Sequence, residues 1–222
     1  MKIILNLLKG SNYMKISTSF LSSKNIPNTL IKLNETDTDY IHVDIMDGKF
    51  TKNKTMPFSE MKNIYKYTDK RLDVHLMVKN PEKYIPQYAS LNTEYITFHI
   101  ETENIIEENI SLIKNYSIKA GLAINPNTKI SEIIPYLPLL DLILIMGVEP
   151  GEGGQEFIKE TKDKIEELKV LLKEYNSNII ISVDGGINNN TKDYCKDADI
   201  LVSGSYIVNS DNYQDKITSL RK

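Results

Sequence analysis

Eight short apolar runs, rich in β-branched residues, recur along this 222-residue chain. Lysine- and glutamate-rich stretches separate the runs, most clearly Glu103–Tyr116 and Phe157–Tyr175, and their amphipathic pattern predicts helices. Strands that alternate with helices in this way predict βαβ units and a parallel sheet. The runs look apolar on both faces, as expected where helices cover such a sheet. They lie at residues 15–21, 40–46, 71–78, 95–100, 118–124, 141–147, 179–184 and 199–203.

Eight consecutive units predict a closed (β/α)8 barrel, the TIM barrel, rather than an open doubly wound sheet. The chain is shorter than the roughly 250 residues typical of that fold, so its connections should be tight. We expect a single domain over residues 14–222, because no linker or low-complexity segment interrupts the pattern. Residues 1–13 are expected to be a disordered N-terminal extension or to precede the natural start, since the first run follows Met14 at once.

Charge and composition exclude several classes of function. The net charge of −3 and the lack of a basic block argue against nucleic-acid binding. No stretch approaches the roughly 20 apolar residues of a membrane helix, so we expect no membrane partner. The single cysteine, Cys195, rules out an internal disulfide and fits a reducing compartment. A cytoplasmic location is the resulting expectation.

Three of the runs present metal-ligand residue types as they end. Alternate residues of a strand share a face, so His42 and Asp44 point one way, and Asp73 and His75 do likewise. Asp184 ends the seventh run. The chemistry of such barrels takes place at the carboxyl ends of the strands, where these side chains could meet. A lone histidine there is more often a core residue with its hydrogen bonds satisfied. A metal site is favoured here because four ligand-type residues occur together: His42, Asp44, His75 and Asp184.

Mixed imidazole and carboxylate ligands suit zinc, iron(II), manganese or cobalt and do not choose among them. We expect one such divalent ion per subunit, acting as a Lewis acid on a substrate carbonyl oxygen. Asp44 and Asp184 could then supply a base and an acid on opposite faces of a bound substrate. The alternative for Asp184 is an ordinary Asp-Gly-Gly turn, so its assignment to the site depends on the presence of the other three residues.

Glycine-containing turns follow the sixth, seventh and eighth runs. Glycines let backbone N–H groups converge on an anion, and the loops after strands seven and eight of such barrels often hold phosphate. Plain tight turns are the alternative, but three of them on neighbouring strand ends favour a phosphate site. Glu152 is an unfavourable neighbour for a phosphate unless its side chain points away. The candidate residues of these turns are Gly151, Glu152, Gly153, Gly154, Gly185, Gly186, Gly204 and Ser205.

Four further residues are candidates for supporting roles in the site. Met46 and Met77 are on adjacent runs; methionine there is usually core, but the pair could form an apolar floor under a substrate. Ser19 could hydrogen-bond a substrate hydroxyl, although a serine at a strand end is most often a cap. Glu101 could orient a metal ligand from outside the ligand set.

Eight segments of the chain form an ordered set of motifs: Ile16–Leu21, His42–Gly48, Asp73–Val78, Thr97–Glu101, Gly121–Pro126, Met146–Gln155, Val183–Ile187 and Val202–Ser205. Together these segments resemble the ribulose-phosphate 3-epimerase family from Ile16 to about Val208. The resemblance implies a metal-dependent interconversion of D-ribulose 5-phosphate and D-xylulose 5-phosphate, a step of the pentose phosphate pathway, through a cis-enediolate.

The resemblance also implies roles for single residues. Asp44 and Asp184 would move the proton at carbon 3 from opposite faces, while the glycine turns would hold the phosphate. A homo-oligomer, a dimer or larger, is expected by the same likeness. By family analogy the metal ligands are His42, Asp44, His75 and Asp184, and the substrate-lining residues are Ser19, Met46, His75, Met77 and Asp184.

The chain departs from the family's pattern at Thr18, Lys52, Gly147 and Glu152, none of which is a candidate ligand. Three other functions remain open at this point. One is a 3-epimerase of a six-carbon ketose phosphate such as allulose 6-phosphate. Another is a phosphate-binding barrel that decarboxylates or isomerises without metal. The third is a non-catalytic phosphosugar binder, against which the intact pair of aspartates argues.

Overall fold

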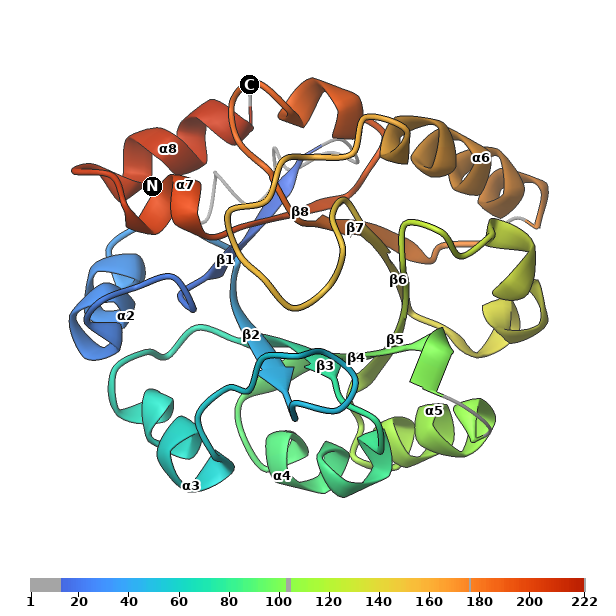
Figure 1. The fold of residues 1–222 in the computed structure, drawn as a ribbon, viewed down its shortest axis with the longest axis horizontal. Helices are drawn as coiled ribbons and strands as arrows, with labels where there is room; N and C mark the ends of the chain where they lie inside the picture. The colour runs from blue at the N-terminus through green and yellow to red at the C-terminus, as the bar shows by residue number, and fades with distance from the viewer. Residues whose placement is uncertain (1–12, 103–104, 176, 222) are drawn as a thin grey trace, which may run out of the picture.

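Eight parallel strands close into one barrel in sequence order, with β8 paired to β1 (Figure 1). The computed structural model describes residues 13–102, 105–175 and 177–221. The predicted barrel is therefore confirmed, whereas the proposed extension at 1–13 falls outside the described residues except for Tyr13. The strands are β1 (Lys15–Ser19), β2 (Tyr40–Met46), β3 (Leu72–Met77), β4 (Thr93–His99), β5 (Lys119–Ile124), β6 (Leu142–Met146), β7 (Ile180–Asp184) and β8 (Ile200–Ser203).

Helices surround the barrel on its outside (Figure 1). Asn25 caps the helix after β1, where its side chain accepts a hydrogen bond from the N–H of Asn28 at 3.1 Å. Between β5 and β6 the chain forms 3-10 turns, in a segment whose Pro135 and Pro138 lack the N–H that an α-helix interior uses. Among the described residues, no helix is long and apolar enough to cross a membrane. The α-helices are α2 (Ile26–Asn34), α3 (Phe58–Met61), α4 (Ile85–Ala89), α5 (Ile106–Asn115), α6 (Thr161–Glu174), α7 (Ser205–Val208) and α8 (Tyr213–Leu220), and the 3-10 helices are η1 (Lys62–Lys66), η2 (Pro81–Lys83), η3 (Ile100–Thr102), η4 (Ile130–Glu132), η5 (Ile134–Leu139) and η6 (Lys192–Cys195).

The helix predicted to start at Phe157 begins four residues later, at Thr161. Phe157 is buried in the preceding loop, where its ring stacks on that of Tyr194 with 5.9 Å between centroids. The same ring and backbone lie against Gly147 and Gly186. Phe157 therefore packs the loop over the end of the barrel instead of the first turn of α6.

Other predicted boundaries move by a few residues. The first strand ends at Ser19 rather than at residue 21, because the chain turns there and the N–H of Ser23 bonds the carbonyl of Phe20 at 2.8 Å. The fourth begins at Thr93 and ends at His99 instead of spanning 95–100. α5 begins at Ile106 rather than at residue 103, which lies outside the described residues.

Inward-facing positions change character along the strands. Tyr40, at the start of β2, belongs to an apolar cluster inside the barrel, whereas His42 and Asp44 follow on the same face. Outward-facing residues such as Ile41 and Val43 pack beneath the helices in the larger core. The inward face of β2 thus changes from the apolar Tyr40 to the polar His42 and Asp44 along the strand. The inner apolar cluster consists of Tyr40, Tyr95, Ala123, Leu142, Leu144, Met146 and Ile200.

Candidate active site

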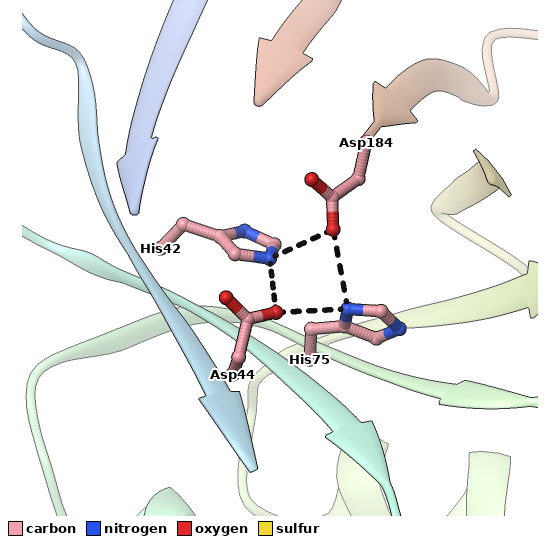
Figure 2. Close-up of side chains that lie close together, drawn as sticks. All are labelled: His42, Asp44, His75 and Asp184. Carbon is pink, nitrogen blue, oxygen red and sulfur yellow. Dashed lines mark hydrogen bonds and ion pairs between the residues drawn. The ribbon is translucent and has the colours of Figure 1, made fainter. Parts of the chain in front are cut away.

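Four side chains from three strands converge at the carboxyl end of the barrel (Figure 2). β2 and β3 pair in register, with Asp44 opposite His75, so their inward side chains lie side by side. Asp184 approaches from the end of β7, on the other side of the cluster (Figure 2). The sequence predicted that His42, Asp44, His75 and Asp184 could meet, and the structure brings all four into one group.

The distances within this group are short. The Nε2 of His42 and the Nδ1 of His75 each lie 3.2 Å from the Oδ1 of Asp44. Both nitrogens lie 3.6 Å from the Oδ2 of Asp184. One ligand atom from each residue falls within 4.8 Å of the others. The two imidazoles are fully buried, while the side chains of Asp44 and Asp184 are 10% and 18% exposed, so the carboxylates form the open side of the group.

The electrostatics of the group favour a cation between the carboxylates. Burial lowers the pKa of His42, yet Asp44 and Asp73 outweigh burial and raise that pKa well above its usual value. Burial likewise opposes a charge on His75, but Asp184 and Asp44 raise its pKa. Two imidazole nitrogens and two carboxylate oxygens are also a ligand set that divalent transition metals accept. The residues present therefore fit a metal ion.

Each histidine is held by a second partner on its far side. The Nδ1 of His42 lies 2.8 Å from the Oδ2 of Asp73, which also accepts a hydrogen bond from the Ser17 hydroxyl at 2.8 Å. A carboxylate at the second nitrogen of a ligating histidine fixes its tautomer and orientation. Asp73 shares a strand face with His75 in the sequence pattern, but no role was predicted for it. The sequence feature that could have indicated a role for Asp73 is its position two residues before His75.

The far side of His75 faces a second, longer chain of contacts. Its Nε2 lies 2.9 Å from the Nε2 of His99, whose Nδ1 lies 3.1 Å from the Oε2 of Glu101. The other oxygen of Glu101 accepts hydrogen bonds from the Thr128 hydroxyl and, at 2.9 Å, from the N–H of Asn125. Glu101 therefore acts on His75 only through His99.

The surroundings of His99 disfavour a charge on its ring. Burial lowers its pKa to about 4, although Glu101 pulls in the opposite direction. Burial raises the pKa of Glu101, but hydrogen bonds from His99, Thr128 and Asn125 lower it overall, so Glu101 is ionised. Lys164 reinforces the loop that holds Glu101, because its Nζ donates to the carbonyls of Asn125, Pro126 and Thr128 at 3.0, 2.7 and 2.7 Å.

A pocket of about 710 Å³ opens directly above the four-residue group. Asp44 and Asp184 line it, whereas His42 and His75 lie beneath them. The hydroxyl of Ser19 also lines the pocket and donates to the Oδ2 of Asp44 at 2.9 Å. Ser19 therefore contacts a carboxylate of the group rather than only capping β1. All of the predicted substrate-lining residues except His75 face this pocket.

Methionines form the apolar part of the pocket wall. Met46 and Met77 are opposite each other in the β2–β3 pairing and are 6% and 3% exposed. Met146, from β6, lines the same pocket and had not been singled out as a site residue in the sequence. Three largely buried thioethers therefore give the inner end of the pocket an apolar surface beside the carboxylates.

The outer end of the pocket is built from the predicted glycine turns. Gly186 has a φ of +68°, and a Cβ there would lie 2.9 Å from the backbone of Phe157, so only glycine fits. Among the described residues, the N–H groups of Gly186, Gly204 and Ser205 donate no hydrogen bond within the protein. Unpaired N–H groups at a pocket wall are suited to binding an anion.

The loop after β6 crosses over the mouth of the barrel (Figure 1). Its Gly151 carbonyl accepts a hydrogen bond from the side chain of Asn53, in the loop after β2, at 2.8 Å. Gln155 ties the same loop to itself by donating to the carbonyls of Glu149 and Glu152 at 2.7 and 2.9 Å. Glu152 lines the pocket. The loop after β6 is therefore tied both to itself and to the loop after β2.

Several pocket residues carried no signal in the sequence. Lys216 and Asn209 reach the pocket from the region of α8 and α7, and three consecutive asparagines follow β7. None lies at a strand end, where inward side chains are expected to meet. The asparagines are Asn188, Asn189 and Asn190.

Comparisons with known proteins agree with this geometry. The model of the ribulose-phosphate 3 epimerase family matches residues 15–208. The chain is 34% identical over 213 residues to the ribulose-phosphate 3-epimerase of Bacillus subtilis, covering 94% of this chain and 98% of that protein. It is 37% identical over 196 residues to the enzyme of that name from Chlamydia pneumoniae, with 86% of each covered.

Solved structures of low sequence identity share the fold. The 3-hexulose-6-phosphate synthase of Salmonella typhimurium superposes with a TM-score of 0.62 at 17% identity, covering 94% of this chain and 97% of that one. The phosphoribosyl anthranilate isomerase of Thermococcus kodakaraensis gives 0.61 at 14% identity, covering 94% and 96%. At these identities the likeness shows the barrel alone. The sequence matches go further: the chain belongs to the ribulose-phosphate 3-epimerase family and is an isomerase.

Proposed function

We propose that this protein epimerises D-ribulose 5-phosphate at carbon 3 to D-xylulose 5-phosphate with the help of one divalent metal ion per subunit. The observation that carries the proposal is the pair of carboxylates, Asp44 and Asp184, that reach one buried group from β2 and β7 and face the pocket. Family membership supports the substrate, because the matched relatives bear the name ribulose-phosphate 3-epimerase.

His42, Asp44, His75 and Asp184 would hold the metal ion. When bound, such an ion supplies Lewis-acid chemistry, which polarises the substrate carbonyl and makes the neighbouring C–H more acidic. Zinc, iron(II), manganese and cobalt all suit these donors. Assembly as a homo-oligomer and a cytoplasmic location stay predictions.

The two aspartates move the proton. One carboxylate takes the proton from carbon 3, and the bonding electrons pass into an enediolate spread over carbons 2 and 3. The other aspartate, in its acid form, returns a proton to the opposite face of carbon 3, and the carbonyl at carbon 2 is restored. Burial raises the pKa of Asp44, but its two histidine neighbours outweigh burial and lower that pKa, which favours the ionised form that acts as base.

Neighbouring side chains position these groups. Ser19 donates to the Oδ2 of Asp44 and orients the carboxylate toward the pocket. Asp73 holds the ring of His42, and the pair of His99 and Glu101 holds that of His75. Met46, Met77 and Met146 keep water from the developing enediolate. The N–H groups of Gly186, Gly204 and Ser205 would bind the phosphate.

The test is hydrogen–deuterium exchange at carbon 3 of D-ribulose 5-phosphate in D₂O, followed by NMR with and without prior chelation. Exchange that depends on metal and produces D-xylulose 5-phosphate supports the proposal. Binding of the sugar phosphate without any exchange contradicts it. The same assay with D-allulose 6-phosphate distinguishes a six-carbon substrate, because the larger kcat/KM identifies the preferred ketose phosphate.

A further inference from the structure

The charged side chains that line this pocket are mostly negative. Asp44 and Asp184 line its inner end, and Glu149 and Glu152 also line it. Of the described residues that line the pocket, Lys216 alone carries a positive charge. Unpaired backbone N–H groups carry only partial charges, so a full positive charge beside them would add to the attraction for a phosphate dianion.

Lys216 extends from α8 and is held in place by an aromatic ring. Its Nζ lies 4.7 Å from the centroid of the Tyr206 ring, within the range of a cation–π contact. The hydroxyl of Tyr206 is in turn hydrogen-bonded with that of Ser219 at 2.9 Å. Within the described part of the chain, Lys216 forms no ion pair with a carboxylate. Lys216 is therefore half-buried, restrained and free of a negative partner.

The lysine lies at the phosphate end of the pocket rather than at the metal end. It lines the same cavity as Gly204, Ser205 and Asn209, which belong to the segment running from the end of β8 through α7. Tyr206 follows Ser205 directly, so the ring that holds Lys216 is one residue from an unpaired N–H group. The backbone donors and the ammonium group are thereby linked through one short segment.

We infer that Lys216 is a substrate-binding residue that contacts the phosphate of the ketose phosphate, an inference that rests on the proposed function. The N–H groups of the glycine turns set the position of the phosphate, and Lys216 supplies a full positive charge at the same end of the pocket. Lysine binds phosphate as a point charge, so it adds affinity without demanding one fixed geometry. It thereby favours a phosphorylated ketose over the free sugar.

The experiment compares Lys216→Met with Lys216→Arg and with the control Lys173→Met, which removes the same charge from an exposed position on α6. Binding of inorganic phosphate to each protein is measured by isothermal titration calorimetry, which needs no turnover. We expect about tenfold weaker phosphate binding by Lys216→Met, as for loss of one charge-assisted hydrogen bond. Lys216→Arg should keep most of the affinity, and Lys173→Met should match the unaltered chain.

Steady-state kinetics then separate binding from chemistry. In Lys216→Met the KM for D-ribulose 5-phosphate should rise by the same factor of about ten, with kcat changed less than about twofold. Equal phosphate affinity in Lys216→Met and the unaltered chain would overturn the inference, as would an unaltered chain that binds no phosphate. Failure of the proposed function looks different: no variant, including the unaltered chain, would epimerise the ketose phosphate, whereas the calorimetric difference at Lys216 would persist.

Discussion

The two ends of the pocket are constructed from different parts of the chain. At the inner end, side chains on β2, β3 and β7 converge, and every imidazole is fully buried and has a second partner. At the outer end, loop backbone provides the surface, with exposed glycines such as Gly153 and Gly154. The inner end is thus a network of buried side chains suited to chemistry, and the outer end is a backbone surface suited to holding part of a substrate.

The difference predicts which kinetic or binding property changes when each end is mutated. Changes at the inner end should lower kcat or metal affinity, because their geometry is shared among several buried groups. Changes at the outer end should raise KM and leave the metal in place. Each substitution below tests that division, from the largest expected effect to the smallest.

Asp184→Asn should abolish most turnover. The amide keeps the size of the side chain but can neither take nor return the proton at carbon 3. We expect kcat to fall by about 10³- to 10⁴-fold, at the upper end of what acid–base groups contribute. Steady-state epimerase assays check this, with the exposed Asp193→Asn as the matched control. Near-normal activity in Asp184→Asn would refute the scheme with two carboxylates.

His75→Asn should weaken metal binding. The imidazole is one of four donors in the group, and asparagine cannot reproduce its nitrogen lone pair at the same position. Since loss of an outer partner of a ligand already costs about 10- to 100-fold in metal affinity, we expect at least the upper figure here. Metal content after dialysis against a chelator gives the measurement. Unchanged content would remove His75 from the ligand set.

Glu101→Gln tests whether Glu101, acting through His99, helps to position the ring of His75. The amide should weaken the contact that aligns the ring of His99 and, through it, His75. We expect about tenfold lower metal affinity with KM little changed, a smaller effect than that of His75→Asn. Asp73→Asn offers the parallel test on His42. Metal affinity is measured by competition with a chromogenic chelator. If both variants bound metal as tightly as the unaltered chain, these outer carboxylates would have no part in positioning the ligands.

Gly154→Ala should affect the outer end alone. Gly154 has a φ of +79°, and a Cβ added there would have no atom within 4 Å, so the alanine meets backbone strain but no clash. The strain is about 1 kcal/mol, and the exposed loop can relax part of it. We expect KM to rise a few-fold at constant metal content, measured by steady-state kinetics and metal analysis of the same sample. A fall in metal affinity would show that the two ends are not independent.

The inner end could be predicted from the sequence because its residues obey the period of a strand. His42 and Asp44 are two positions apart, and parallel strands bring their carboxyl ends to one rim, so residue type and spacing suffice. The role of Asp73 was not predicted, since a carboxylate two positions before a histidine can point to several neighbours. Its contact with His42 depends on the β2–β3 register, which no local pattern specifies.

The outer end could be predicted only in part. Glycines mark turns, so the loops after β6, β7 and β8 were recognisable. Lys216 was not, because a lysine on an amphipathic helix usually faces solvent and its approach to the pocket depends on how α8 packs beside α7. The start of α6 was misplaced for a similar reason: Phe157 fits a helical pattern but is used to pack a loop.

The four converging residues also divide unequally between the halves of the chain. Three come from β2 and β3, whereas Asp184 comes from β7, in the other half of the chain. A bound ion would therefore join strands that are remote in sequence, as a cross-link does, and would stabilise the folded chain against unfolding in proportion to its binding. Neither half of the barrel alone has the complete ligand set. Retention of tightly bound metal would accordingly report whether the barrel has closed, and proteolytic nicking between β4 and β6 that separates the halves should release it.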